Sequence, residues 1–136
     1  MLVHGSCVAL NGRGLLILGP SGSGKSALTL ALMGMGAALV SDDRTLLRRD
    51  GDRVLADAPD TIRGLIEARG IGILRADPAG VVPLALVADL GGAGDARLPP
   101  LRSHDVLGVA LPLVSVPFGP HLAPALRQYL LGGRAG

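Results

Sequence analysis

The chain has 136 residues, enough for one domain with a single buried core, and its one cysteine, Cys7, excludes an internal disulfide framework. Its formal net charge of +2 comes from scattered arginines, and only Phe118 and Tyr129 are aromatic, which argues against a stacking surface for nucleic acid. The longest apolar run is too short and too proline-broken to span a membrane, and no signal peptide is recognisable, so we expect a soluble cytoplasmic domain over residues 1–136.

Turn residues and apolar periodicity predict alternating strands and helices along the chain. Asn11-Gly12 between two apolar runs is the strongest short hairpin signal, and glycines end the predicted helices at Gly34, Gly36 and Gly70. The predicted elements are strands at 6–10 and 14–18, a helix at 25–36, a strand at 37–40, a hairpin over 44–56, a helix at 59–70, strands at 71–74 and 81–90, a loop at 91–105, a strand at 111–117 and a helix at 121–131. This alternation predicts an α/β fold, a P-loop nucleotide-binding sheet with an added antiparallel N-terminal hairpin.

The stretch "GPSGSGKS" between the second predicted strand and the first helix matches the phosphate-binding pattern G-x-x-x-x-G-K-[ST] completely. Its glycines allow successive N–H groups to point at phosphate oxygens, and the following helix adds its positive dipole end. Lys25, the only lysine of the chain, can reach the β- and γ-phosphates, and the Ser26 hydroxyl can bind Mg²⁺. We therefore expect ATP to contact this glycine-rich loop, which consists of Gly19, Pro20, Ser21, Gly22, Ser23, Gly24, Lys25 and Ser26.

Two adjacent acids, Asp42 and Asp43, follow the predicted strand at 37–40. The strand after the first helix often lies beside the strand that enters a P-loop, so we expect its carboxyl end to open onto the γ-phosphate. One carboxylate there would hold the metal through water or accept a proton from the attacking group. Two alternatives stay open: the pair caps the following turn, or Asp89, at the end of an apolar strand, is the metal acid instead.

Several stretches together resemble the catalytic domain of HPr kinase/phosphorylase, a bacterial enzyme that phosphorylates a serine of HPr, the phosphocarrier of the sugar phosphotransferase system. They are "HG", "GPSGSGKS", "LVSDDR" and "IEARGIGIL", in the family's order and near its spacing, and they cover about residues 3–74. The resemblance implies that His4 is the catalytic histidine and Asp43 the catalytic acid. It also implies that Glu67, the only glutamate, binds magnesium together with Ser26.

The C-terminal half departs from this family. A Pro-Val-Arg-Pro-Gly-Arg-Asn stretch, tied in the family to the reverse phosphorylase reaction, is replaced by "VPFGPHLA", which lacks both arginines. Arg97 in "DARLP" resembles the arginine of the family's Asp-Arg-Leu-Gly stretch. The family's N-terminal domain has no counterpart here, so the chain resembles a short, single-domain form.

The resemblance implies an ATP- and Mg²⁺-dependent protein serine kinase that acts on HPr or an HPr-like phosphocarrier and forms a homo-oligomer. We expect little phosphorylase activity, and no nucleic-acid or membrane partner. Two other functions remain open at this point: a small-molecule P-loop kinase that uses Asp89, and a non-catalytic ATP-binding sensor module.

Overall fold

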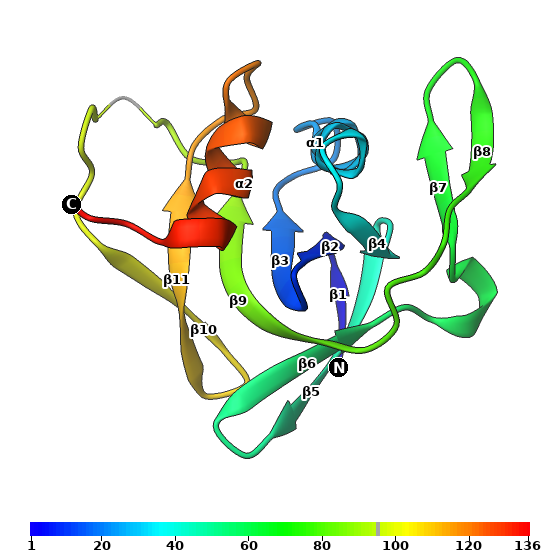
Figure 1. Cartoon of the computed structure of the whole chain (residues 1–136), viewed down its shortest axis with the longest axis horizontal. Coiled ribbons are helices and arrows are strands. Elements are labelled where there is room, and N and C mark those ends of the chain that lie inside the picture. Colours follow the sequence, from blue (N-terminus) through cyan, green and yellow to red (C-terminus); the bar gives the residue numbers. More distant parts are fainter. Residues whose placement is uncertain (95) are drawn as a thin grey trace.

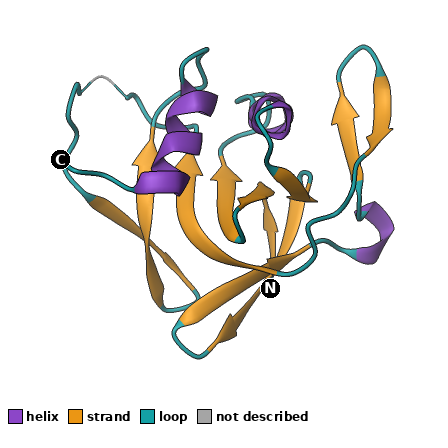
Figure 2. Ribbon diagram, viewed as in Figure 1, coloured by secondary structure: helices purple, strands orange, loops and turns teal. Residues whose placement is uncertain are grey.

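A curled sheet with two α-helices on one face forms the centre of the computed structural model, which describes residues 1–94 and 96–136 (Figure 1; Figure 2). The helices are α1 (Lys25–Gly34) and α2 (Leu122–Gly132), and a short 3₁₀ turn, η1, spans Asp60–Ile62. The strands are β1 (Leu2–His4), β2 (Ser6–Leu10), β3 (Arg13–Leu18), β4 (Ala38–Ser41), β5 (Arg44–Asp50), β6 (Arg53–Asp57), β7 (Leu65–Ala68), β8 (Gly72–Arg75), β9 (Val82–Asp89), β10 (Arg102–Val106) and β11 (Val109–Ser115).

Three parallel strands in the middle of the sheet end at the same level. The strand order is β1-β5-β6-β9-β3-β2-β4, and β11 joins the other side of β9 with β10 paired to it. Leu18 at the end of β3 is in register with Asp89 of β9, which is in turn in register with Ser115 of β11. The glycine-rich loop leaves β3 at this edge, so the loops after β9 and β11 lie on one side of it.

β2 and β4 occupy the other side of β3, which corrects one expectation. β4 pairs with β2 in antiparallel fashion and does not lie beside β3. The cause is the tight turn at Asn11-Gly12, where both residues have positive φ, since it folds β2 directly onto the edge of β3. Because β2 is antiparallel to both neighbours, β4 still runs parallel to β3, and its carboxyl end points the same way.

The sheet is covered on both faces, which explains why β2 is buried at every position. Side chains on one face pack against α1 and α2, whose buried contacts include Leu28, Leu32, Leu126 and Leu130. The other face packs against the curled strands of the β5–β6 and β10–β11 hairpins. The helices and this second layer therefore hold the carboxyl ends of the central strands in fixed relative positions.

The helix predicted over residues 59–70 is wrong: this segment forms η1 and then strand β7, which pairs with β8. Gly64 adopts φ +72 between the two, a left-handed conformation that ends any helix there. A Cβ at Gly64 would also lie 2.8 Å from the carbonyl oxygen of Ala76. Downstream, Gly70 (φ +83) turns the chain into a hairpin, which projects from the body of the protein (Figure 1).

Two further strands lie where none was expected. β1 pairs with β5 at the N-terminus, and β10 occupies residues that we assigned to the loop at 91–105. The β10–β11 turn contains Leu107 and Gly108, both with positive φ. Leu-Gly is not a typical turn pair, and β10 is mostly exposed and polar, so neither the turn nor an apolar alternation was visible in the sequence.

The base of the β7–β8 hairpin is fixed by an ion pair between Arg63 and Asp57, the last residue of β6. The hydrogen bond from Arg63 lowers the pKa of the Asp57 carboxyl, opposed in part by desolvation. A lowered folded-state pKa stabilises the protein above the unfolded-state pKa, and this contribution disappears as the pH falls through the folded-state value.

We therefore expect Asp57→Asn to lower the free energy of unfolding at pH 7 by about 1 kcal/mol, after discounting for solvent screening. The difference from wild type should shrink as the pH falls below about 4. Urea unfolding at a series of pH values measures it. Asp60→Asn is the matched control, because the Asp60 side chain also pairs with Arg63 but is 96% exposed. An equal effect of both variants would contradict the assignment of this stabilisation to the ion pair between Arg63 and Asp57.

Candidate active site

The glycine-rich loop connects β3 to α1 in a conformation that only glycine adopts easily. Gly22 and Gly24 have φ of +81° and +101°, and Gly24 is the N-cap of α1. A Cβ on Gly19 would lie 2.6 Å from Ser23 Oγ, so the loop closes tightly on itself. The Ser23 hydroxyl is buried and has no hydrogen-bond partner in the described part of the chain. The loop thus has the curled backbone that an anion-binding turn before a helix requires.

The Lys25 side chain lies back over this loop. Its Nζ donates hydrogen bonds to the carbonyl oxygens of Gly19, at 2.8 Å, and Pro20, at 3.1 Å. These two contacts keep the ammonium group beside the N-terminus of α1, and the side chain is only half-buried. An ammonium group in this position can exchange its carbonyl contacts for phosphate oxygens without rearrangement of the fold.

Asp42 is the centre of a hydrogen-bond network that joins distant segments. The side chain follows β4 and is 8% exposed. Its Oδ1 accepts hydrogen bonds from Ser26 Oγ, at 2.8 Å, and from Ser6 Oγ, at 3.2 Å. Its Oδ2 accepts one from the backbone N–H of Glu67, at 3.0 Å. One carboxylate therefore connects the start of α1, the start of β2 and the β7–β8 hairpin.

Asp43 lies beside this network with its side chain exposed. Its φ of +66 places it in the left-handed region, which aspartate tolerates better than most residues. The Asp43 N–H donates to Ser6 Oγ at 3.0 Å, so Ser6 holds both acids. A pocket of about 140 Å³ opens here between the acids and the hairpin, and it is lined by Asp42, Asp43, Arg44, Ile62, Leu65, Ile66, Glu67 and Ile73.

The structure brings together most, but not all, of the residues expected from the sequence. His4 is exposed on β1 and is the register partner of Arg44, so it lies next to the acid pair, although no hydrogen bond in the described residues joins it to Asp43. Arg97 is exposed in the loop between β9 and β10, and no described contact links it to the acids. Asp89 ends β9, on the opposite side of β3 from β2 and β4. Its Oδ1 accepts a hydrogen bond from the N–H of Gly91 at 2.9 Å.

The residues around Asp42 fit a hard divalent cation such as Mg²⁺. Ser26, Asp42, Asp43 and Glu67 offer oxygen ligands, which is the donor type that Mg²⁺ prefers. Within residues 1–94 and 96–136, no three carboxylate, imidazole or thiol side chains form a metal cage by themselves. Mg²⁺ does not need one, since it commonly binds through one or two carboxylates together with substrate phosphates.

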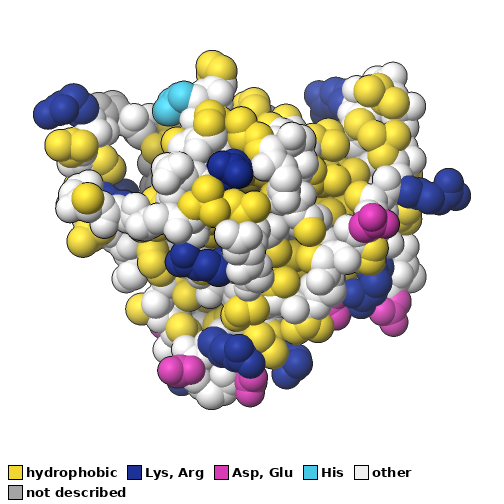
Figure 3. Space-filling view, in the orientation of Figure 1, with side chains coloured by type: hydrophobic (Ala, Val, Ile, Leu, Met, Phe, Trp, Pro, Cys, Tyr) yellow, Lys and Arg dark blue, Asp and Glu magenta, His cyan; other side chains and the backbone are white. Residues whose placement is uncertain are grey.

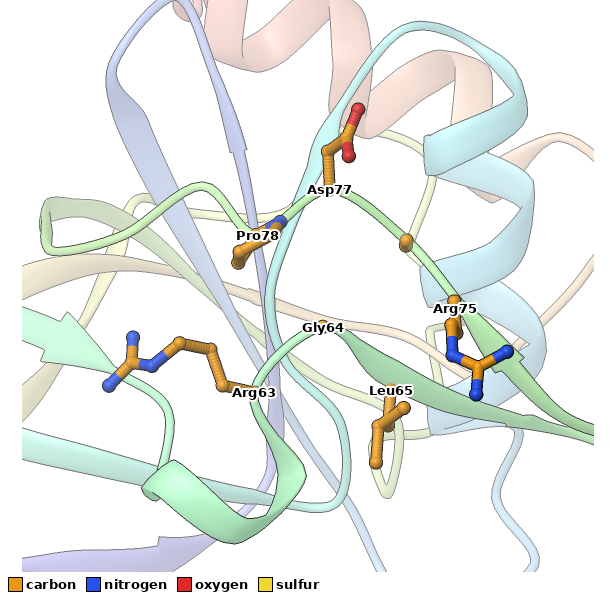
Figure 4. Close-up of a pocket in the computed structure, with 7 residues that line it drawn as sticks. Arg63, Gly64, Leu65, Arg75, Asp77 and Pro78 are labelled. Carbon is orange, nitrogen blue, oxygen red and sulfur yellow. The ribbon is translucent and has the colours of Figure 1, made fainter.

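A second pocket, of about 630 Å³, lies at the base of the β7–β8 hairpin. It is lined by Arg63, Gly64, Leu65, Arg75, Ala76, Asp77 and Pro78. Figure 4 shows Arg63 and Arg75 extending in different directions and Asp77 pointing away from both. Charged groups do not converge in this pocket, and we assign no chemistry to it.

Features that would indicate other classes of partner are weak on this molecule. On the face seen in Figure 3, the basic side chains are scattered and form no continuous patch. In the described part of the chain, neither helix has the length and apolar composition needed to cross a bilayer. The acid network next to the glycine-rich loop therefore remains the strongest site.

Ser6 is the residue that sequence reasoning missed. It follows His4-Gly5 at the start of β2, where a small polar residue in an apolar run gives no particular signal. Its complete burial, with one hydrogen bond given and one received, is visible only once β2 and β4 are paired. The contact of Asp42 with Ser26 likewise could not be deduced from spacing.

Comparison with known proteins matches the part of the chain that contains the acid network to one family. The family model of the HPr Serine kinase C-terminal domain matches residues 1–78. The HPr kinase/phosphorylase of Caldanaerobacter subterraneus is 48% identical over 73 residues, which are 53% of this chain and 24% of that protein. That of Chloroherpeton thalassium is 35% identical over 130 residues, which are 86% of this chain and 38% of that protein.

A solved structure extends the likeness to nearly the whole chain. The Hpr(Ser) kinase/phosphatase from Coxiella burnetii matches with a TM-score of 0.81 and 26% identity, covering 96% of this chain and 88% of that one. The first curated relatives are much longer, and this chain spans about a quarter of their length. Since the family model covers more than half of the residues, the chain belongs to the HPr serine kinase C-terminal domain family.

Proposed function

We propose that residues 1–136 form one kinase domain that transfers the γ-phosphoryl group of ATP to a serine of HPr or an HPr-like phosphocarrier. The observation that carries this proposal is the Asp42 network, because it joins Ser26 of the glycine-rich loop to the hairpin that presents Glu67. The end of the glycine-rich loop is thereby hydrogen-bonded to the acid that lines the pocket beside the hairpin. The family to which the chain belongs supports the choice of substrate.

Each residue has a defined task in the proposed reaction. Lys25 and the loop N–H groups hold the β- and γ-phosphates, and Ser26, Asp42 and Glu67 supply oxygen ligands for Mg²⁺, which when bound neutralises phosphate charge. Asp43 accepts the proton of the substrate serine while the hydroxyl oxygen of that serine forms a bond to the γ-phosphorus. The bond from that phosphorus to the bridging oxygen breaks, and ADP leaves. His4, next to Arg44, supports the charge at Asp43.

Asp89 is a poorer candidate for the metal acid in the alternative of a small-molecule kinase. It lies on the opposite side of β3 from the Asp42 network and already caps the turn at Gly91. Asp42, by contrast, contacts the Ser26 hydroxyl directly.

Incubation with γ-labelled ATP, Mg²⁺ and a purified HPr-like carrier tests the proposal. We expect label on a serine of the carrier, and none on a carrier whose acceptor serine is replaced by alanine. Label on small molecules alone would support the small-molecule kinase. ATP binding without any transfer would support a sensor module.

We also expect little phosphorylase activity, meaning attack of inorganic phosphate on phosphoserine-HPr. That reaction brings a second anion close to Asp43 and the phosphoserine, and like charges a few ångströms apart repel unless cations offset them. The resemblance assigns part of this charge compensation to a C-terminal stretch with two arginines, and the corresponding stretch here, "VPFGPHLA", has none. No described contact links Arg97 to the acids.

Release of pyrophosphate from phosphoserine-HPr in excess inorganic phosphate measures this activity. We expect a rate far below that of the forward reaction under matched conditions. Comparable forward and reverse rates would contradict the expectation and would require an anion site built from other residues, for instance an arginine of a second subunit in a homo-oligomer.

A further inference from the structure

The single phenylalanine of the chain packs against the glycine-rich loop. A Cβ placed on Gly24 would lie 2.9 Å from Cγ and 3.1 Å from Cδ2 of Phe118, so the aromatic ring is in direct contact with the Gly24 backbone. Phe118 as a residue is nevertheless 42% exposed. An apolar ring that is held against a loop and open to solvent has surface left for a ligand.

Phe118 lies on the side of the loop that faces away from the acid network. It belongs to the segment between β11 and α2, and β11 follows β9 on one side of β3. Asp42 follows β4, on the other side of β3. The strand order separates Phe118 from Asp42, and the loop and the N-terminus of α1 lie between them (Figure 1).

The two ends of a nucleoside triphosphate bound to this loop would lie on these two sides of it. Its γ-phosphate must lie toward the acids and the metal ligands, so its nucleoside end must leave the loop on the other side, where the segment after β11 begins. This direction follows from the position of the Asp42 network and uses nothing about the base itself.

We propose that Phe118 forms the nucleoside subsite, with its exposed ring surface contacting the purine base or its ribose while Gly24 supports the ring from behind. The inference rests on the proposed binding of ATP to the glycine-rich loop. Contact with an aromatic ring suits any base, because every base has a π-face, and such a contact involves no hydrogen-bond readout. The subsite therefore adds affinity for the nucleoside with little preference between ATP and GTP.

The test separates nucleoside affinity from phosphate affinity. Dissociation constants of the Mg²⁺ complexes of ATP and of inorganic triphosphate are measured by calorimetry for wild type, Phe118→Ala and Phe118→Tyr. We expect Phe118→Ala to weaken ATP binding about five- to a hundredfold, the range for one base–aromatic contact, and to leave triphosphate binding within about twofold. Phe118→Tyr should retain ATP binding.

Leu131→Ala is the matched control. Leu131 is a 39% exposed apolar side chain at the far end of α2, next to Leu130, whose carbonyl oxygen accepts a hydrogen bond from Arg13 at the opposite end of β3 from the loop. It should change neither constant. Circular dichroism establishes that each variant is folded.

Three results would overturn the inference, and one of them would also overturn the proposed function. Unchanged ATP binding by folded Phe118→Ala would show that the ring does not contact the nucleoside. An equal loss of ATP and triphosphate binding would show that Phe118 only supports Gly24. Failure of wild type to bind triphosphate at all would overturn the proposed function itself, and the inference with it.

Discussion

Replacing Asp43 with asparagine is expected to lower the rate of phosphoryl transfer by about 10²–10⁴ and to leave ATP binding nearly unchanged. The variant removes the proposed base for the serine proton and leaves the glycine-rich loop unchanged. Asparagine is the right substitution, because it has nearly the same size and also tolerates the φ of +66 at this position. Single-turnover transfer to the carrier and the dissociation constant of ATP measure the two effects.

Asp89→Asn is the matched control for this variant, since Asp89 also ends a strand at the same edge of the sheet. Its effect on transfer should be mild, because its carboxylate caps a local turn. A large loss with Asp89→Asn and a small one with Asp43→Asn would reverse the assignment and favour the small-molecule kinase.

Lys25→Met is expected to abolish most phosphoryl transfer, by about 10²–10³ or more, while the fold survives. The ammonium group is proposed to stabilise charge on the transferred phosphate. Among the described residues, its hydrogen bonds go to the carbonyl oxygens of Gly19 and Pro20. Methionine keeps an unbranched side chain of nearly the same length and removes the charge. Transfer to the carrier and thermal unfolding of the same preparation measure the activity and the stability.

Arg127→Met controls for the loss of one positive charge. Its Nε donates to the carbonyl oxygen of Met35, outside the glycine-rich loop, so transfer should remain close to wild type. A Lys25→Met protein that transfers phosphate at the wild-type rate would show that the glycine-rich loop is not the phosphate site.

Local sequence signals predicted the elements that depend on neighbouring residues. Asn11-Gly12 predicted the β2–β3 hairpin, and the turn at Gly51 predicted the β5–β6 hairpin, because the conformation of a tight turn is decided within it. The first helix begins at Lys25 as expected, directly after the glycines. The closing helix at Leu122–Gly132 has the apolar spacing of a half-buried helix.

Features that depend on distant contacts could not be predicted in this way. Residues 59–70 look helical by periodicity, but Gly64 packs against the carbonyl of Ala76, and Asp42 accepts the N–H of Glu67, so the segment is extended. The neighbour of β4 depends on the β2–β3 hairpin, which places β2 at the edge of β3. For the same reason the sequence left open whether Asp42 or Asp89 lies near Ser26, a question of strand order.

The Asp42 network also constrains the order in which the site can assemble. Its members come from positions 6, 26, 42 and 67, so no short fragment of the chain contains the complete surroundings of the carboxylate. Contacts between distant positions form late, after the entropy of loop closure has been overcome. During synthesis from the N-terminus, the hairpin and the glycine-rich loop are complete before the chain that carries Glu67 exists. A nascent chain that ends after α1 therefore contains the glycine-rich loop but none of Asp42, Asp43 and Glu67.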